Sequence, residues 1–166
     1  MSSVALLRGI NLGKINKVDM KSLKQLFEEL GFHNVRTYIQ TGNVIFDNSE
    51  CSEGKLEEAL RITYGFSIPV TLRTKSELEE VHNHPLFLND QTFVMFLQRK
   101  ITNEQITILK EIVEDEFVVL HRRNLIINHS KNYHQTKYTN AFFEKKLQTV
   151  CTARNKNTVI KILERM

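Results

Sequence analysis

VRTYIQTGNVIF, residues 35–46, is the stretch that decides the fold. Apolar and polar residues alternate over its first half, as in a half-buried strand, and Val44–Phe46 forms a second apolar run. Thr41-Gly42-Asn43, between the two runs, has the residue types of a tight hairpin turn. A hairpin that follows a helix is the centre of a βαββαβ unit, and the flanking segments complete one.

Strands and helices on both sides of this hairpin follow in the expected order. Val4–Ile10 is predicted to be a strand, and apolar residues between Met20 and Leu30 recur at helical spacing before Gly31. Leu56–Ile62 has the pattern of a second helix, and Ile68–Leu72 alternates as a closing strand. This order is that of the ferredoxin-like fold, or alpha-beta plait.

The second half of the chain starts the same order again. The predicted elements are a strand, a helix, a hairpin, a helix and a last helix: Thr92–Gln98, Glu104–Val113, Phe117–Leu120 with Leu125–Asn128, residues 138–147, and residues from about Asn155 onward. A helix therefore stands where the closing strand would be. We predict an α+β protein of two ferredoxin-like (alpha-beta plait) subdomains packed together, with an extra C-terminal helix. The predicted boundaries are 1–75 for the first plait, 76–91 for a linking helix and loop, and 92–166 for the second plait-like unit, βαββα plus the C-terminal helix.

Composition indicates a soluble globular protein. Of the 166 residues, 41% are hydrophobic and 25% charged, and the apolar runs are too short for a membrane span. The N-terminus lacks the pattern of a signal peptide, and Cys51 and Cys151 are isolated, as expected of reduced thiols. We expect a cytoplasmic protein with no membrane partner.

Charge is distributed unevenly along the chain. Residues 1–40 hold six basic and three acidic side chains, residues 41–120 seven and fourteen, and residues 121–166 ten and two. Segregation of this kind favours an electropositive face that attracts phosphate or nucleic acid, although a solvated surface would show it too.

RGINLGKINK, residues 8–17, is a glycine-containing loop between a predicted strand and a predicted helix. It is not a Walker loop, because three residues separate Gly9 from Gly13 and Ile15 stands where a hydroxyl is needed. GINLGK also fails the GxGxxG fingerprint. Two interpretations stay open: the loop holds a phosphate, or its glycines and asparagines only make turns.

Strand order brings further polar residues toward this loop. The hairpin turn with Gln40 and Asn43 should lie at the same edge of the first sheet, and Arg99-Lys100 should meet Arg122-Arg123 at the equivalent edge of the second. Helix starts add more donors. The candidate ligand-binding residues are Arg8, Asn11, Lys14, Lys17, Gln40, Asn43, Lys137, Arg154 and Asn155.

Other functional patterns are weak. The predicted central strands lack the aromatic residues with which RNA-recognition domains stack bases. The six histidines have no metal-ligand spacing, and Ser130, Thr136 and Cys151 lack an elbow or triad signature. We expect no metal and no cofactor, and whether the protein is an enzyme stays open.

Four motifs carry a resemblance to a known family: RGINLGKINKVDM, TYIQTGNVIF, TKYTNAFFEKKL and TARNKNTVIKIL. From about Leu6 to Leu163 the chain resembles the uncharacterised bacterial family called domain of unknown function 1697. The resemblance implies two joined alpha-beta plaits and no established activity. The residues that match the family motifs are Arg8, Gly9, Asn11, Gln40, Gly42, Asn43, Lys137, Arg154 and Asn155.

Departures from the family pattern bear on the loop. Lys14 stands where the family commonly has a second glycine, and Asp19 where it has a proline. His134-Gln135 replaces a glycine-bearing approach to Lys137, and Lys156 a frequent tryptophan. The loop can therefore lose a glycine, which weakens the claim that close backbone approach to a phosphate is indispensable.

The leading hypothesis is an anion- or phosphate-binding module, with nucleic acid as the first suspected partner. An enzyme or sensor for a small anionic metabolite, bound between the two plaits, is the alternative. A protein-interaction domain is a third possibility.

Overall fold

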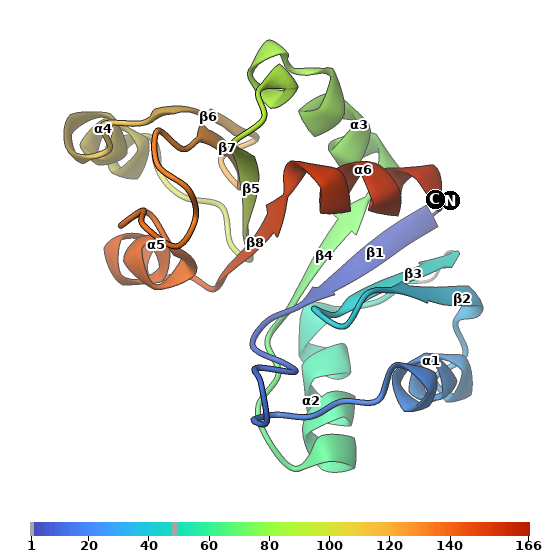
Figure 1. Cartoon of the computed structure of the whole chain (residues 1–166). Helices are drawn as coiled ribbons and strands as arrows, with labels where there is room; N and C mark the ends of the chain where they lie inside the picture. The colour runs from blue at the N-terminus through green and yellow to red at the C-terminus, as the bar shows by residue number, and fades with distance from the viewer. Residues whose placement is uncertain (1, 48–49) are drawn as a thin grey trace. The chain divides into compact units, whose positions relative to one another are not determined.

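The computed structural model describes residues 2–47 and 50–166, which form two compact units (Figure 1). The first unit extends to Leu78 and also includes Lys161–Met166; the second is Glu79–Ile160. Each unit contains one four-stranded antiparallel sheet. The predicted α+β fold in two halves is confirmed.

The first sheet has the strand order β2-β3-β1-β4. Its strands are β1 (Ser2–Leu7), β2 (His33–Tyr38), β3 (Asn43–Asp47) and β4 (Val70–Thr74). Since β1 and β2 are both antiparallel to β3, they are parallel to each other, as in a split βαβ unit. Val4 lies opposite Ile45, so the segments at Val4 and Val44 are central neighbours, as predicted.

Helices α1 (Met20–Glu29) and α2 (Glu53–Tyr64) cover one face of this sheet (Figure 1). Asp19 caps α1 by accepting a hydrogen bond from Ser22 N at 3.0 Å, and Ser52 caps α2 in the same way. The core between helices and sheet consists of fully or nearly fully buried residues: Ala5, Leu7, Val44, Phe46, Leu23, Phe27, Leu56 and Leu60.

The second sheet has the equivalent order β6-β7-β5-β8. Its strands are β5 (Thr92–Leu97), β6 (Glu116–Leu120), β7 (Asn124–Asn128) and β8 (Cys151–Asn155). Helices α4 (Asn103–Ile112) and α5 (Asn140–Leu147) pack on one face around Leu109 and Phe143. A capping box between Thr102 and Gln105 starts α4.

Strand β8 corrects one sequence prediction. No closing strand was expected before the last helix, yet Cys151–Asn155 pairs with β5 along its whole length. Its inward residues are only Cys151 and Ala153, and its outward residues are polar, so the apolar alternation that identifies a strand is weak. The second unit is therefore a complete βαββαβ.

The other segments complete the chain. Helix α3 (Lys75–Asn83) and a 3-10 helix, η1 (Pro85–Leu88), follow β4. The expected C-terminal helix is α6 (Lys156–Glu164). Within the described part of the chain, no helix is both long enough and apolar enough to span a bilayer.

The two sheets carry the same polar residues at equivalent positions on the face away from their covering helices. Leu6 lies between Asn43 and Thr71 in the first sheet, and Phe96 between Asn124 and Thr152 in the second. One step along this face, Val4 lies beside Arg73, and Val94 lies beside Arg154. All these residues are buried. The two plaits are thus an internal structural repeat, down to an arginine on the last strand of each.

Candidate functional site

Asn11, in the loop that opens after β1, holds two loops together. Its Nδ2 donates to Val18 O at 3.1 Å and to Gln40 O at 2.9 Å, while its Oδ1 accepts from Val18 N at 2.9 Å. The loop and the hairpin turn therefore meet at one edge of the first sheet, as the strand order predicts. The amide of Asn11 is used to bind backbone rather than to face a ligand.

The hairpin turn is packed in a similar way. Asn43 is buried, and its Nδ2 donates to Tyr38 O at 2.9 Å and Thr41 Oγ1 at 3.2 Å. Gly42 has φ +95°, and a Cβ there would lie 2.8 Å from Leu7 Cβ and Ile10 Cδ1. These contacts favour the structural interpretation of the loop's asparagines and glycines.

The cations of the first-unit loop differ in exposure. Lys14 and Lys17 are exposed, as is Gln40, whereas Arg8 is half-buried and its backbone N donates to Pro69 O at 3.0 Å. Asn16 Nδ2 donates to Gly9 O at 3.0 Å and so fixes the turn beside Lys17.

The three candidate residues of the second unit have separate roles. Asn155 Oδ1 accepts from Thr158 N at 2.8 Å and caps α6. Arg154 is buried, with a hydrogen bond from Nη1 to Ala153 O at 2.9 Å. Lys137 is exposed, and its Nζ lies 5.4 Å from the centroid of the Tyr138 ring. Of these three, only Lys137 presents its charge to solvent.

Lys137 is one of the residues that line a small pocket of about 130 Å³. The buried carboxylate of this pocket is that of Asp115, which accepts a hydrogen bond from Ser130 Oγ at 2.6 Å and lies 3.4 Å from His129 Nδ1. Burial lowers the pKa of His129, and the nearby Asp115 carboxylate opposes that shift. The lining residues are Glu114, Asp115, Ser130, Lys131, Gln135, Thr136, Lys137 and Tyr138.

The contact between Asp115 and His129 has no signature in the sequence, because no motif connects the two residues. The carboxylates of Glu114 and Asp115 offset the charges of Lys131 and Lys137. A pocket of mixed charge is a poor phosphate site, because the carboxylates repel the anion that the lysines attract.

A second basic region lies at the edge of the second sheet where β5 ends. Leu97 N donates to Arg123 O and Ile101 N to Arg122 O, each at 2.8 Å. These two bonds join the loop that carries Arg99 and Lys100 to the turn between β6 and β7. We call Arg99, Lys100, Arg122 and Arg123 the arginine-lysine edge.

A tight turn and a side-chain hydrogen bond hold the backbone of the arginine-lysine edge. His121 and Arg122 have φ of +51° and +57°, as in the tight turns that suit the twist of a hairpin. Arg99 N donates to Thr149 Oγ1 at 3.1 Å. Arg99, Lys100 and Arg122 are exposed and Arg123 is half-buried. Residues 98–103 and 120–124 contain no Asp or Glu, but two carboxylates come from other segments: Glu80 from α3 contacts His121 Nε2, and Glu144 from α5 lines a pocket together with Arg99.

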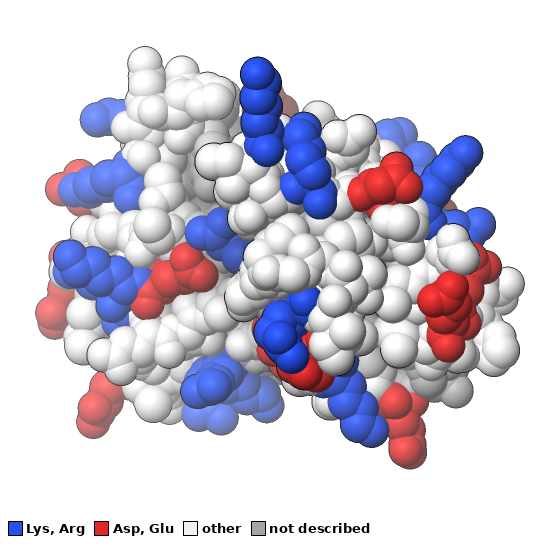
Figure 2. All heavy atoms as spheres, turned by 90° about the horizontal axis from the view of Figure 1, so that it is seen from below, with Lys and Arg blue, Asp and Glu red and all other residues white. Residues whose placement is uncertain are grey.

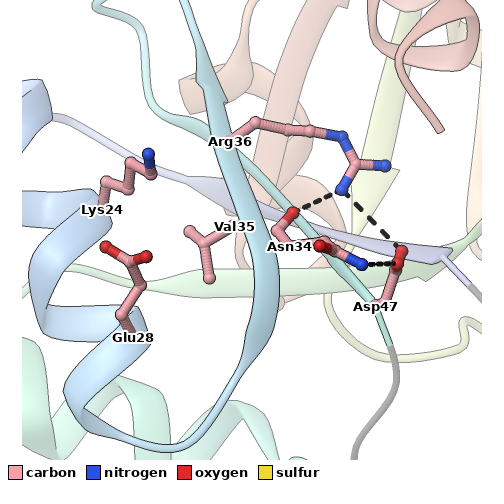
Figure 3. A pocket seen from close by; sticks show the side chains of 6 residues that line it. All are labelled: Lys24, Glu28, Asn34, Val35, Arg36 and Asp47. Atoms are coloured by element: carbon pink, nitrogen blue, oxygen red, sulfur yellow. Dashed lines mark hydrogen bonds and ion pairs between the residues drawn. The ribbon is translucent and has the colours of Figure 1, made fainter.

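The first unit has an open pocket of about 640 Å³ between α1 and the edge strand β2 (Figure 3). Asp47 accepts from Asn34 Nδ2 at 2.7 Å and lies 3.8 Å from Arg36 Nη1. The hydrogen bond from Asn34 is the largest of the interactions that hold the pKa of Asp47 below its usual value. Lys24 and Glu28 line the same pocket from α1 (Figure 3). Cations are matched by carboxylates here, so the pocket lacks the charge excess of the arginine-lysine edge.

Figure 2 shows one face of the described structure, on which lysines and arginines are interspersed with aspartates and glutamates. Net charge alone therefore does not mark a binding surface on this face. Local clusters of cations, such as the arginine-lysine edge, are the better candidates for a binding surface. Among the described residues, no group of three or more His, Cys, Asp or Glu side chains could hold a metal ion.

The fold and these surfaces define a two-plait α+β protein with basic loops. A family model described as "Protein of unknown function (DUF1697)" matches residues 1–125, and the chain belongs to this family. The chain is similar to a solved structure of a conserved bacterial protein, SP0830 from Streptococcus pneumoniae. That similarity has 27% sequence identity and a TM-score of 0.73, and it covers 99% of this chain and 97% of the other. No curated protein matches the sequence.

Proposed function

We propose that the protein is a binding module for phosphate-bearing polyanions, with nucleic acid as the first candidate, and that the arginine-lysine edge makes the main contact. The observation that carries this proposal is the pair of backbone hydrogen bonds from Leu97 and Ile101 to the turn at Arg122 and Arg123. They hold four cationic residues in one region of a fixed backbone.

Arginine suits this role because its planar guanidinium can hold two phosphate oxygens at once. A polyanion that follows the edge would release condensed counterions as each phosphate is neutralised. If four phosphates are contacted, a plot of the logarithm of the affinity against the logarithm of the salt concentration should fall with a slope of about 3 to 4.

Base stacking on the sheet is not part of the proposal. The face of the second sheet away from α4 and α5 presents Val94, Phe96 and Ile126, all of which are buried. RNA-recognition domains use an accessible sheet with aromatic rings for that purpose. Contacts to the phosphate backbone, which carry no sequence information directly, fit this surface better.

The small-metabolite alternative has less support. The pocket at Lys137 has a volume of only about 130 Å³, and the carboxylates of Asp115 and Glu114 line it. Lys14 and Lys17 of the first unit, and Lys137 of the second, are exposed cations that could add weaker contacts to a long polyanion. Asn11 and Asn43 would hold backbone during binding rather than the ligand.

The test is fluorescence anisotropy with a fluorescein-labelled single-stranded DNA of about 20 nucleotides, over a range of salt concentrations. The variant is Arg99→Gln with Lys100→Gln, since both side chains are exposed in a loop. Lys21→Gln with Lys110→Gln is the control, because it removes the same charge from exposed helix positions.

We expect the edge variant to lose about tenfold or more in affinity at moderate salt, and its salt slope on single-stranded DNA to fall by about 1.4. The control should bind nearly as the wild type does. Equal losses in the two variants, or wild-type binding that ignores salt, would refute the proposal.

A further inference from the structure

Two large aliphatic side chains stand in solvent at the end of the loop after β1. Leu12 is 54% exposed and Ile15 is 65% exposed. Leu12 N donates to Ile15 O at 3.0 Å and Ile15 N to Leu12 O at 2.9 Å, which closes a minimal antiparallel bridge around Gly13. Bridge partners point their side chains to the same face, so Leu12 and Ile15 form one apolar pair.

The backbone holds this pair in place. Asn11 and Asn16 flank the bridge, and both have the left-handed φ that asparagine tolerates, +51° and +55°. Asn11 N donates to Asn16 O at 2.9 Å, and the side chains of both residues bind neighbouring backbone carbonyls. The exposure of Leu12 and Ile15 is therefore built into a hydrogen-bonded loop.

A third aliphatic residue lies in the adjoining turn. Ile39 is 44% exposed and has φ +47°, a conformation that a β-branched residue rarely adopts. Asn11 joins the two loops through its bond to Gln40 O, the residue after Ile39. Strained residues of this kind persist where the surrounding structure enforces them, and they cluster at functional positions. We call Leu12, Ile15 and Ile39 the aliphatic tip.

Cations accompany the aliphatic tip. Lys14 lies inside the bridge and Lys17 just after it, and both are exposed; Arg8 begins the loop. Residues 8–18 and 38–43 contain no Asp or Glu. An occupant that offers an apolar layer with negative charge beside it would complement this surface.

We propose that the aliphatic tip docks on the surface of an anionic lipid bilayer. Leu12, Ile15 and Ile39 enter the boundary between headgroups and acyl chains, and Lys14 and Lys17 extend to the lipid phosphates. Flexible lysine stems suit this geometry because the charge can stay in water while the methylenes are buried.

The residue types favour a bilayer over a protein groove. Protein interfaces draw their binding energy from Trp, Tyr and Arg, and lysine is depleted at their cores. The tip itself is aliphatic, and the charged residues nearest in sequence to Leu12 and Ile15 are Lys14 and Lys17, whereas Arg36 is nearest to Ile39. Docking on a bilayer surface needs no membrane-spanning segment.

The test is co-flotation of the purified protein with phosphatidylcholine vesicles that contain about one third phosphatidylglycerol, against pure phosphatidylcholine. Leu12→Ser with Ile15→Ser removes the apolar pair. Ile62→Ser with Ile108→Ser is the matched control, because these residues are 70% and 51% exposed on α2 and α4. Arg99→Gln with Lys100→Gln reports any adsorption through the second unit.

We expect wild-type protein to float with the anionic vesicles and the tip variant to lose at least about fivefold in bound fraction, with the Ile62 and Ile108 control unchanged. The Arg99 and Lys100 variant should still float. Absence of wild-type binding to anionic vesicles would overturn the proposal. The same result is expected if the partner of the tip is a protein instead of a bilayer. Equal binding by the tip variant would also overturn it, since adsorption would then be electrostatic only.

Discussion

Replacing Asn11 with alanine distinguishes a structural loop from a ligand loop. The side chain makes three hydrogen bonds, of 3.1, 2.9 and 2.9 Å, to Val18 O, Gln40 O and Val18 N. Each such bond contributes about 0.5–1.5 kcal/mol net to stability. The substitution also places alanine at φ +51°, where it is less favourable than asparagine.

Together these losses predict that Asn11→Ala lowers the free energy of unfolding by about 2–4 kcal/mol. Urea denaturation followed by circular dichroism measures this change, with an unchanged m-value expected. Asn157→Ala is the control, because Asn157 is exposed on α6 and the change should stay within about 0.5 kcal/mol.

Polyanion binding by folded Asn11→Ala protein should stay close to that of the wild type, because the proposed main contact lies in the other unit and Lys14 and Lys17 add only weaker contacts. A variant that is as stable as the wild type but no longer binds DNA would refute the structural role of Asn11. It would restore the interpretation of the loop as the phosphate site.

Three further outcomes follow from the structure. Gly42→Ala should cost about 2–4 kcal/mol by urea denaturation, because φ is +95° and the new Cβ would clash with β1 and the loop that follows it; Gly54→Ala in α2, where no atom lies within 4 Å, should not destabilise. Burial lowers the pKa of His129. The stability that neutral His129 contributes is therefore complete above about pH 6.5 and is lost as the pH falls below that value. The melting temperature of the wild type should fall with decreasing pH in this range, and that of His129→Gln should lack this dependence. A wild-type melting temperature that rises on acidification through this range would contradict the assignment. Tyr138→Phe should cost about 1–2 kcal/mol, because its hydroxyl accepts from Glu114 N at 2.9 Å, and melting temperatures equal to the wild type would contradict this.

The fold was largely predictable because its signals are local. The alternation and turn in residues 35–46 identify the β2–β3 hairpin, and helical spacing identifies α1 and α2. Strand β8 was missed because Thr152 and Arg154 face away from the helices and leave only two apolar residues inward. Burial of an arginine on a strand is set by the surrounding structure and leaves no pattern in the sequence.

The candidate site was predictable only in part. Strand order correctly predicted that Arg99-Lys100 meets Arg122-Arg123, since topology alone decides which loops share an edge. The roles of Asn11, Asn43 and Asn155 depend on hydrogen bonds to particular backbone atoms, which residue type does not specify. The Asp115–His129 contact joins residues from separate segments and has no sequence signature.

The most direct test of the proposed function is a nuclear magnetic resonance titration of ¹⁵N-labelled protein with a short DNA oligonucleotide. The largest amide shift changes should map to Arg99, Lys100, Arg122 and Arg123, and they should reverse on addition of salt. The amides around Asn11 should move little by comparison. Changes centred on residues 8–17 or on the Lys137 pocket, or no changes in any amide, would contradict the account.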